Sequence, residues 1–381
     1  MATFQPLRFS PGKPDFASAL NKRVNEYFAQ NKISKHANLT MKLKTAFMLT
    51  LYIAPYAVMM SGLVSNTWGM LGLCVLMGLG LAGIGLSVMH DANHGAYSSN
   101  PNVNKWLGYT LNMMGATAFN WKVQHNVLHH TYTNVHEADE DVSQRGLFRL
   151  NPHADWKPIH RFQFLYAWLF YGLMTFVWVF FKDIVRLKKY QENGMVERVN
   201  ASAKEEWFVL LVTKLLYFTY ALVLPAIFLP YNFAQIFLGF FIIHYIAGFI
   251  LAIIFQPAHV TSETEFPMPD GDNKLENNFF IHQMLTTKNF ARKNKLFSWY
   301  VGGLNYQVEH HLFPTVCHVH YEKLAPIVKA TAEEYGIPYL EEETFSEAIL
   351  EHARSLYEFG KKPLPSAETP KVAEPLMEEA A

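Results

Sequence analysis

Long apolar runs alternate with polar segments along this chain, and the alternation predicts its main elements. Four of the runs carry almost no charge. Each has about the 20 residues that a membrane-spanning helix needs. They cover residues 46–65, 69–89, 207–230 and 233–255. Only a few polar or turn-forming residues separate the two runs of each pair. We therefore expect four transmembrane helices arranged as two hairpins.

Two further apolar runs are predicted to lie at the membrane surface. The run over residues 106–119 is too short to span and is expected to form an interfacial or re-entrant helix. In the run over residues 162–181, half of the residues are Phe, Tyr or Trp, which are enriched at the membrane–water interface. Basic residues flank this run on both sides, whereas a spanning helix should show a one-sided excess. We therefore predict a second interfacial helix here.

The remaining segments are polar or mixed and complete the predicted organisation. Residues 1–41 are expected to form a cytoplasmic arm with an amphipathic helix over residues 16–31, and residues 42–359 to form the membrane domain. Residues 360–381 are rich in Pro, Glu, Ala and Lys, which is typical of a disordered tail. The predicted fold class is an all-α integral membrane protein whose polar segments form a helical cap.

The distribution of basic residues predicts which side of the membrane the cap occupies. Lys42 and Lys44 precede the first predicted span, and an excess of basic residues marks the cytoplasmic side. Four crossings then return the chain to the side on which it began. We expect both termini and the polar segments between the hairpins to be cytoplasmic.

Composition narrows the function further. Of the 381 residues, 50% are hydrophobic and only 17% are charged, and the formal net charge is zero. No global positive field therefore points to a nucleic-acid partner. The two cysteines, Cys74 and Cys317, are too few for a disulfide framework or an iron–sulfur cluster.

Histidines cluster at the ends of the apolar segments. Eight of the 17 histidines fall into three short motifs and one isolated position beyond the last apolar run. On an α-helix, His125 and His129 would share one face, as would His90 and His94. The eight residues are His90, His94, His125, His129, His130, His259, His310 and His311.

This set of imidazoles predicts a metal centre on the cytoplasmic face. Neutral imidazole is the commonest metal-binding side chain, and a catalytic zinc site needs only three protein ligands plus water. Eight histidines exceed that number and suit two metal ions, although imidazole alone does not choose between Zn, Fe, Cu and Ni. The sequence contains no His-Glu-x-x-His, which disfavours a zinc protease. A literal G-x-G-x-x-G at residues 78–83 lies in an apolar helix with no preceding strand, so close helix packing is the better interpretation.

The three motifs resemble the histidine boxes of integral-membrane fatty acid desaturases. His90–His94 matches H-x(3,4)-H, and His125–His130 matches H-x(2,3)-H-H. Gln307–His311 matches [HQ]-x(2,3)-H-H, and its leading Gln and its setting, GGLNYQVEHHLFP, resemble the front-end desaturase subgroup. The likeness extends from about residue 40 to residue 340.

This resemblance implies an enzyme that uses O2 to insert a double bond into the acyl chain of an acyl-CoA or an acyl-lipid. It implies two non-haem irons held by the box histidines and completed by His259. Gln307, which stands where other members have His, is a further candidate ligand, directly or through water. The chain has no His-Pro-Gly-Gly of a fused cytochrome b5 domain, so a separate ferredoxin or cytochrome b5 is expected to supply electrons. The basic segment 182–189 is a candidate docking face for that donor, or an ordinary cytoplasmic loop.

Five residues are candidates for supporting the imidazoles, with ordinary packing or hydrogen bonding as the alternative. They are Asp91, Trp121, Asn126, Asn134 and Asn305. The acidic stretch from Glu137 to Asp141 is expected to be a solvated loop, and His244, in mid-helix, a hydrogen-bonded core residue. Two other functions stay open: a lipid hydroxylase on the same scaffold, and a membrane receptor that binds metal without redox chemistry.

Overall fold

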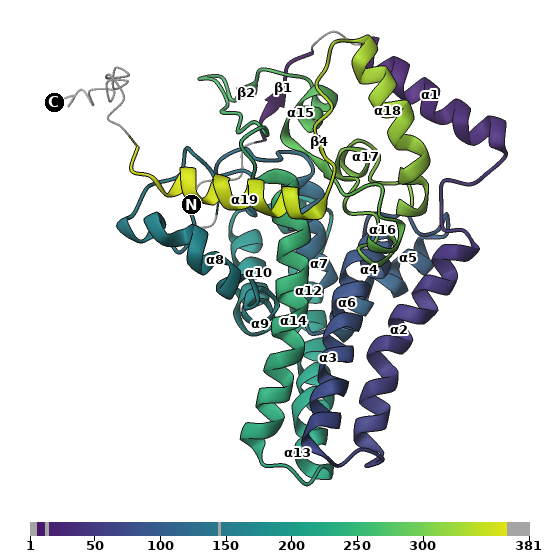
Figure 1. The fold of residues 1–381 in the computed structure, drawn as a ribbon, viewed down its shortest axis with the longest axis vertical. Coiled ribbons are helices and arrows are strands. Elements are labelled where there is room, and N and C mark those ends of the chain that lie inside the picture. Colours follow the sequence, from purple (N-terminus) through teal and green to yellow (C-terminus); the bar gives the residue numbers. More distant parts are fainter. Residues whose placement is uncertain (1–5, 12–14, 144–145, 364–381) are drawn as a thin grey trace.

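The computed structural model describes residues 6–11, 15–143 and 146–363, and within them it is mostly helical. Four helical segments are long and apolar enough to cross a membrane. They are α2 (Leu39–Met60), α3 (Thr67–Gly83) continued by η1 (Ile84–Val88) and α4 (Met89–Asn93), α12 (Ala203–Phe218) continued by η5 (Thr219–Val223) and α13 (Leu224–Phe228), and α14 (Phe233–His259). The predicted two hairpins are confirmed, and they form the narrow lower part of the molecule (Figure 1).

Each span begins at a polar cap that the sequence supplies. Asn38, Asn66, Ser202 and Asn232 each accept a hydrogen bond from a backbone N–H in the first turn. These side chains satisfy donors that the helix leaves unpaired at its start. The caps also place the helix starts a few residues earlier than hydropathy alone predicts, at Leu39 rather than residue 46 and at Ala203 rather than residue 207.

Small residues let the spans approach one another. Helix α3 packs between α2 and α14. A Cβ added at Gly80 would lie 2.7 Å from the backbone N of Tyr52 in α2, and one added at Gly78 would lie 2.9 Å from Cβ of Ile246 in α14. The G-x-G-x-x-G therefore serves helix packing, as predicted.

The two predicted surface helices are broken rather than continuous. Residues 101–129 form four short elements: α5 (Pro101–Gly108), α6 (Thr110–Met113), α7 (Ala118–Trp121) and η2 (Lys122–His129). Residues 158–198 form η3 (Pro158–Phe162), α8 (Gln163–Tyr171), α9 (Met174–Val177), η4 (Trp178–Lys182), α10 (Asp183–Glu192) and α11 (Met195–Arg198). The second set bends by 72° between Tyr171 and Met174, where Gly172 lies against the Tyr245 ring of α14.

The cap closes over the upper end of the spans (Figure 1). It consists of α1 (Asp15–Asn31), α15 (Phe279–Thr286), α16 (Lys295–Tyr300), α17 (Gln307–Leu312), η6 (His318–His320), α18 (Tyr321–Glu334) and α19 (Phe345–Gly360). Two parallel pairs of two-residue strands connect its loops. In the first, β1 (Arg8–Phe9) pairs with β2 (Lys274–Leu275), and in the second, β3 (Asn289–Phe290) pairs with β4 (Glu341–Glu342). The predicted N-terminal helix is present and packs Phe16, Leu20 and Val24 against α18.

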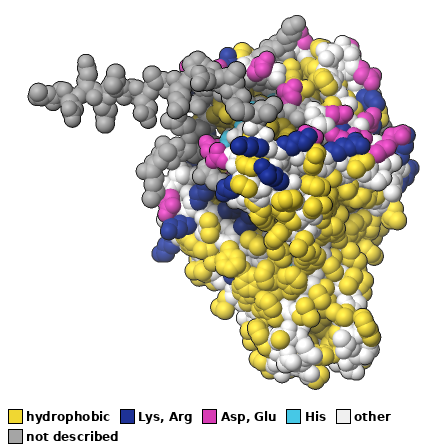
Figure 2. Space-filling view, turned by 60° about the vertical axis from the view of Figure 1, so that its left-hand side comes forward, with side chains coloured by type: hydrophobic (Ala, Val, Ile, Leu, Met, Phe, Trp, Pro, Cys, Tyr) yellow, Lys and Arg dark blue, Asp and Glu magenta, His cyan; other side chains and the backbone are white. Residues whose placement is uncertain are grey.

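The surface divides into an apolar belt around the spans and a charged rim above it. Figure 2 shows hydrophobic side chains covering the lower part, with Lys, Arg, Asp and Glu gathered where the cap begins. This division is the pattern of a multi-pass integral membrane protein. The predicted disordered tail, residues 360–381, lies outside the described residues from residue 364 onward.

Candidate metal centre

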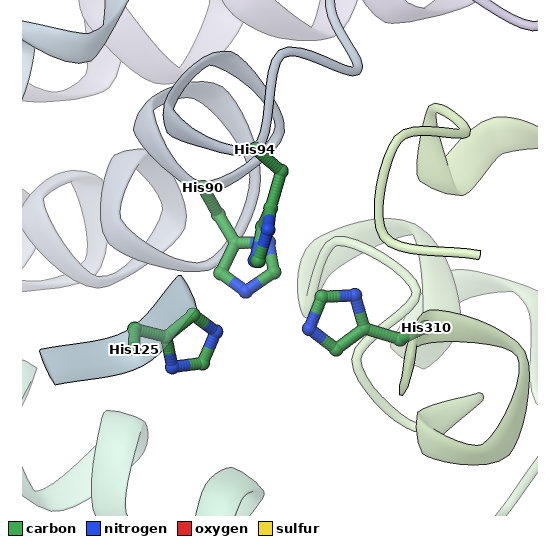
Figure 3. Close-up of side chains that lie close together, drawn as sticks. All are labelled: His90, His94, His125 and His310. Atoms are coloured by element: carbon green, nitrogen blue, oxygen red, sulfur yellow. The ribbon is translucent and has the colours of Figure 1, made fainter. Parts of the chain in front are cut away.

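Four histidines converge at the top of the spans. His90 lies in α4 and His94 is the C-cap of that helix, while His125 comes from η2 and His310 from α17. Each offers one ring nitrogen, and these four atoms all lie within 4.8 Å of one another. Figure 3 shows the four rings turned toward one shared space. This is the first histidine group.

A second group lies beside the first. His129 of η2, His259 at the last position of α14 and His311 of α17 also bring three ring nitrogens within 4.8 Å of one another. The ring centroids are separated by 4.7 Å between His129 and His259, 5.0 Å between His129 and His311, and 4.9 Å between His259 and His311. The three rings of the second histidine group are thus almost equally far from one another.

His130 lies between the two groups. Its Nε2 is 3.2 Å from Nε2 of His125 and 2.9 Å from Nε2 of His310, while its ring stacks on His311 with 4.1 Å between centroids. All eight histidines singled out from the sequence therefore meet in one place.

The second histidine motif is wound as a π-helix. Element η2 has five-residue hydrogen bonds, and the N–H of His130 donates to the carbonyl of His125. The wider turn brings His130 back beside His125, with 3.2 Å between their Nε2 atoms, while His129 joins the second group. The expectation that His125 and His129 share a helix face is confirmed, since their rings stack with 5.2 Å between centroids. Single π-turns inside helices are frequent at functional sites.

The chemistry of the two groups fits metal ions. Nε2 of His94, His129, His259 and His311 is buried and has no hydrogen-bond partner in the described part of the chain. Burial, followed by the neighbouring histidines, lowers the pKa of His125, His130, His310 and His311 well below the usual value. These four rings are therefore neutral, and their converging lone pairs repel one another unless cations lie between them. Burial opposes the charged form of His129, but the adjacent Asp139 raises the pKa of that ring. Two metal ions would satisfy these nitrogens.

The opposite nitrogens of four of these rings have hydrogen-bond partners that point the ligand nitrogens inward. Nδ1 of His129 is 2.9 Å from Asp139 and Nδ1 of His259 is 3.2 Å from the Thr286 carbonyl. Nδ1 of His311 is 2.8 Å from Oε1 of Gln283, and Nδ1 of His310 is 3.2 Å from the Tyr321 hydroxyl. Such partners fix the tautomer and orientation of metal-ligating imidazoles. None of these four partners was predicted, since they lie at no fixed spacing from the motifs.

Asp139 corrects the prediction of a solvated acidic loop. Its side chain is fully buried and also accepts hydrogen bonds from the backbone N–H groups of Asn134 and Asp141. Burial opposes its charged form, but the adjacent His129 and these N–H groups hold the pKa of Asp139 below its usual value. The loop folds inward because its carboxylates have partners there.

The five predicted supporting residues have different surroundings. The ring of Trp121 lies 4.3 Å from that of His125, centroid to centroid. The Asp91 carboxylate accepts from Cys317 and His318 and lies 4.0 Å from Nδ1 of His90.

The three asparagines support the backbone and not the imidazole rings. Asn134 donates to the carbonyl of His259, and Asn126 donates to the carbonyl of Asn93. Asn305 donates to the carbonyl of Phe290 and to Ser298. The structure thus shows the alternative of ordinary hydrogen bonding for the three asparagines, to backbone groups and a serine.

Gln307 and a buried cavity complete the site. Nε2 of Gln307 donates to the Leu304 carbonyl at 2.8 Å, while its Oε1 is buried without a hydrogen-bond partner in the described residues. Gln307, His90, His125 and His310 line a largely apolar cavity that reaches down between the spans. At its membrane end lies His244, which bonds to Tyr217 at 2.5 Å and Thr175 at 3.2 Å, as expected of a hydrogen-bonded core residue.

Comparison with known proteins agrees with this geometry. Residues 66–343 match the model of the family described as fatty acid desaturase. The chain belongs to the fatty acid desaturase family. It is 35% identical, over 95% of its own length and 99% of the relative's, to a Synechocystis protein named sn-1 linoleoyl-lipid 6-desaturase. It is 33% identical over 91% of its length, and over 72% of the relative's, to an acyl-lipid (8-3)-desaturase of Physcomitrium patens. This protein is a membrane fatty acid desaturase. The alternative of a membrane receptor that binds metal without redox chemistry is therefore rejected.

Proposed function

We propose that this desaturase inserts a double bond into an acyl chain esterified to a membrane lipid, on the carboxyl side of an existing double bond. The observation that carries the proposal is the apolar cavity that passes directly beneath the first histidine group. The relatives support its finer points, since their names specify lipid-bound acyl substrates and, for one, the 6 position of a linoleoyl chain.

We propose two non-haem irons as the metals. His90, His94, His125 and His310 would hold one ion, and His129, His259 and His311 the other, with His130 between them and Gln307 as a direct or water-mediated ligand. The bound irons would supply the activation of O2. Overall, R–CH2–CH2–R′, O2, two electrons and two protons give R–CH=CH–R′ and two waters.

The side chains around the irons would orient the substrate and keep out water. The cavity walls hold the acyl chain straight past the first histidine group and present two adjacent methylenes to it. The imidazoles remain neutral ligands because Asp139, Gln283 and the other Nδ1 partners hold their protons on the far side of each ring. Burial of the whole site excludes competing reactions with solvent.

The remaining partners belong to the same proposal. The cap and both termini would face the cytoplasm, where a separate ferredoxin or cytochrome b5 delivers the two electrons. Lys42 and Lys44, in the first two turns of α2 at the end next to the cap, support this orientation.

Expression in a host that makes linoleoyl lipids tests the function. We expect a new trienoic fatty acid whose added double bond lies between the carboxyl group and the original pair, with iron bound at about two per chain. The His311→Ala variant should make none. A hydroxylated product would contradict desaturation, and product confined to the acyl-CoA pool would contradict the lipid-bound substrate.

A further inference from the structure

A second, open pocket adjoins the catalytic cavity at the foot of α10. It has a volume of about 530 Å³, and its lining includes Glu140, Phe181, Lys182, Arg186 and Lys189. Lys182 also lines the cavity beneath the first histidine group. The side chain of Lys182 therefore stands at the junction between the outer pocket and the catalytic cavity.

Among the described residues of the outer pocket, Lys182 is the cation without a direct ion pair. Glu140 binds Arg186 at 3.2 Å and Lys189 at 2.5 Å, and it accepts a further hydrogen bond from Tyr190. Lys182 lies over the Trp178 ring, 5.4 Å from its centroid, and makes no ion pair within 4.0 Å in the described part of the chain. A partly buried ammonium group that contacts no carboxylate favours binding of an anion.

The outer pocket opens at the level where the apolar belt ends. Phe181 and Val185, which also line it, are 63% and 64% exposed, and the neighbouring Ile184 is 44% exposed. Figure 2 shows Lys and Arg side chains gathered along the upper border of the belt. A ligand at this level can keep a polar group in the outer pocket while its hydrocarbon part remains in the bilayer.

We propose that the outer pocket binds the phosphate of a membrane phospholipid, with Lys182 as its contact and the esterified acyl chain passing Lys182 into the catalytic cavity. This inference rests on the proposed lipid desaturase function and names its substrate class. A fixed headgroup sets the distance from the ester to the first histidine group. The double bond is then positioned by counting from the carboxyl end.

The same charges argue against other acyl carriers. Coenzyme A carries several phosphate charges, whereas the described residues of this pocket offer one cation without a direct ion pair, Lys182, and include the carboxylates of Glu137 and Glu140. A neutral sugar headgroup would leave Lys182 without a direct ion pair. One phosphate matches this one cation.

Native mass spectrometry and kinetics on the full-length, iron-loaded enzyme in mixed micelles test the inference. The probes are dilinoleoyl phosphatidylglycerol, a dilinoleoyl galactolipid and linoleoyl-CoA. In Lys182→Met, which keeps the length of the stem, we expect KM for the phospholipid to rise at least about tenfold, the effect of losing one charge-assisted hydrogen bond, with kcat nearly unchanged. Lys182→Arg should restore binding, and Lys188→Met, an exposed change on the adjoining helix α10, should have no effect.

Each other outcome has a definite meaning. An equal loss on phospholipid and galactolipid, or no loss on either, overturns the headgroup assignment. Slower reduction of the iron centre by the donor protein, with an unchanged KM for lipid, identifies a donor-docking face instead. Displacement of the lipid by sub-millimolar inorganic phosphate identifies a free-phosphate site and also overturns the proposal. Selective phospholipid binding without any product supports the headgroup site and refutes the proposed reaction.

Discussion

At the residue scale, His259 is the member of the metal centre that no short motif marks. It is fully buried at the end of α14, its Nε2 lacks a partner among the described residues, and its Nδ1 is held by the Thr286 carbonyl. A solvent-facing histidine would need neither contact. Its position within the second histidine group is what makes it a ligand candidate.

We expect His259→Ala to bind less iron and to lose more than the 10- to 100-fold in activity typical of changes around a metal ligand, while still inserting into the membrane. Iron content and product yield of the purified variant are the measurements. His153→Ala, an exposed histidine outside both groups, is the matched control. Full iron content with normal turnover would remove His259 from the site.

Asp139 tests the role of the hydrogen bonds behind the ligands. Asp139→Ala leaves the His129 N–H without its acceptor, so the variant should retain iron about 10- to 100-fold less well against a chelator. Asp139→Asn keeps an acceptor oxygen and should lose less. Equal iron retention in all three proteins would show that Asp139 serves the fold alone.

At the element scale, the spans are positioned by their glycines and by π-turns. Gly80 brings α3 against α2, and η1 and η2 each introduce a wide turn just before or within a histidine motif. Gly302, with a positive φ, lets the loop before α17 pass against the carbonyl of Leu86 in η1. The third motif can therefore sit directly on the second span.

Replacing Gly80 with Leu should destabilise the enzyme by about 1–3 kcal/mol, because the added side chain has no room against the backbone of α2. Thermal unfolding in detergent measures the loss. Gly72→Leu, in the same helix with nothing within 4 Å of its added Cβ, should leave the midpoint unchanged. Equal midpoints for both variants would exclude tight α2–α3 packing at Gly80.

At the scale of the whole molecule, the polar segments of the chain form the cap and the apolar segments lie in the bilayer. The tips of the two hairpins meet at the end opposite the metal centre, where the Tyr231 hydroxyl donates to the Ser65 carbonyl at 2.8 Å. The hairpin tips and the cap must therefore lie on opposite sides of the membrane.

A cysteine introduced at Leu63, which is 81% exposed near the first hairpin tip, should react only with reagent added outside the cell. One introduced at Lys188, whose side chain is 70% exposed, should react only after permeabilisation. Tyr190 is unsuitable as a reporter because it is fully buried. Labelling of the Lys188 position from outside would reverse the proposed orientation.

Metal removal should lower the stability of the whole cap, because the histidines that meet in the centre come from both hairpins and from α17. A ligand that binds only the folded state stabilises it by about 4 kcal/mol at a thousandfold excess over its Kd. The chelated enzyme should therefore melt earlier than the iron-loaded one, and His129→Ala should show a smaller difference. Identical melting curves would show that no metal bridges these elements.

The sequence by itself determined the class of the fold and which histidines come together. Apolar runs of spanning length have few stable alternatives in a bilayer, so four spans and two hairpins follow from hydropathy. Motif spacing and the position of His259 at the end of an apolar run were enough to name all eight histidines. Short-range spacing and the ends of apolar runs, which set membrane depth, can both be read directly from the sequence.

Only the tertiary structure decided how the histidines divide and what holds them. The π-helical winding of η2 brings His130 back beside His125, and hydropathy carries no signal for an added residue per turn. Asp139, Gln283 and Tyr321 reach the imidazoles across long sequence separations or from a loop that looked solvated. The junction at Lys182 likewise exists only where α10 meets the catalytic cavity, because contacts between distant segments are set by packing and not by local pattern.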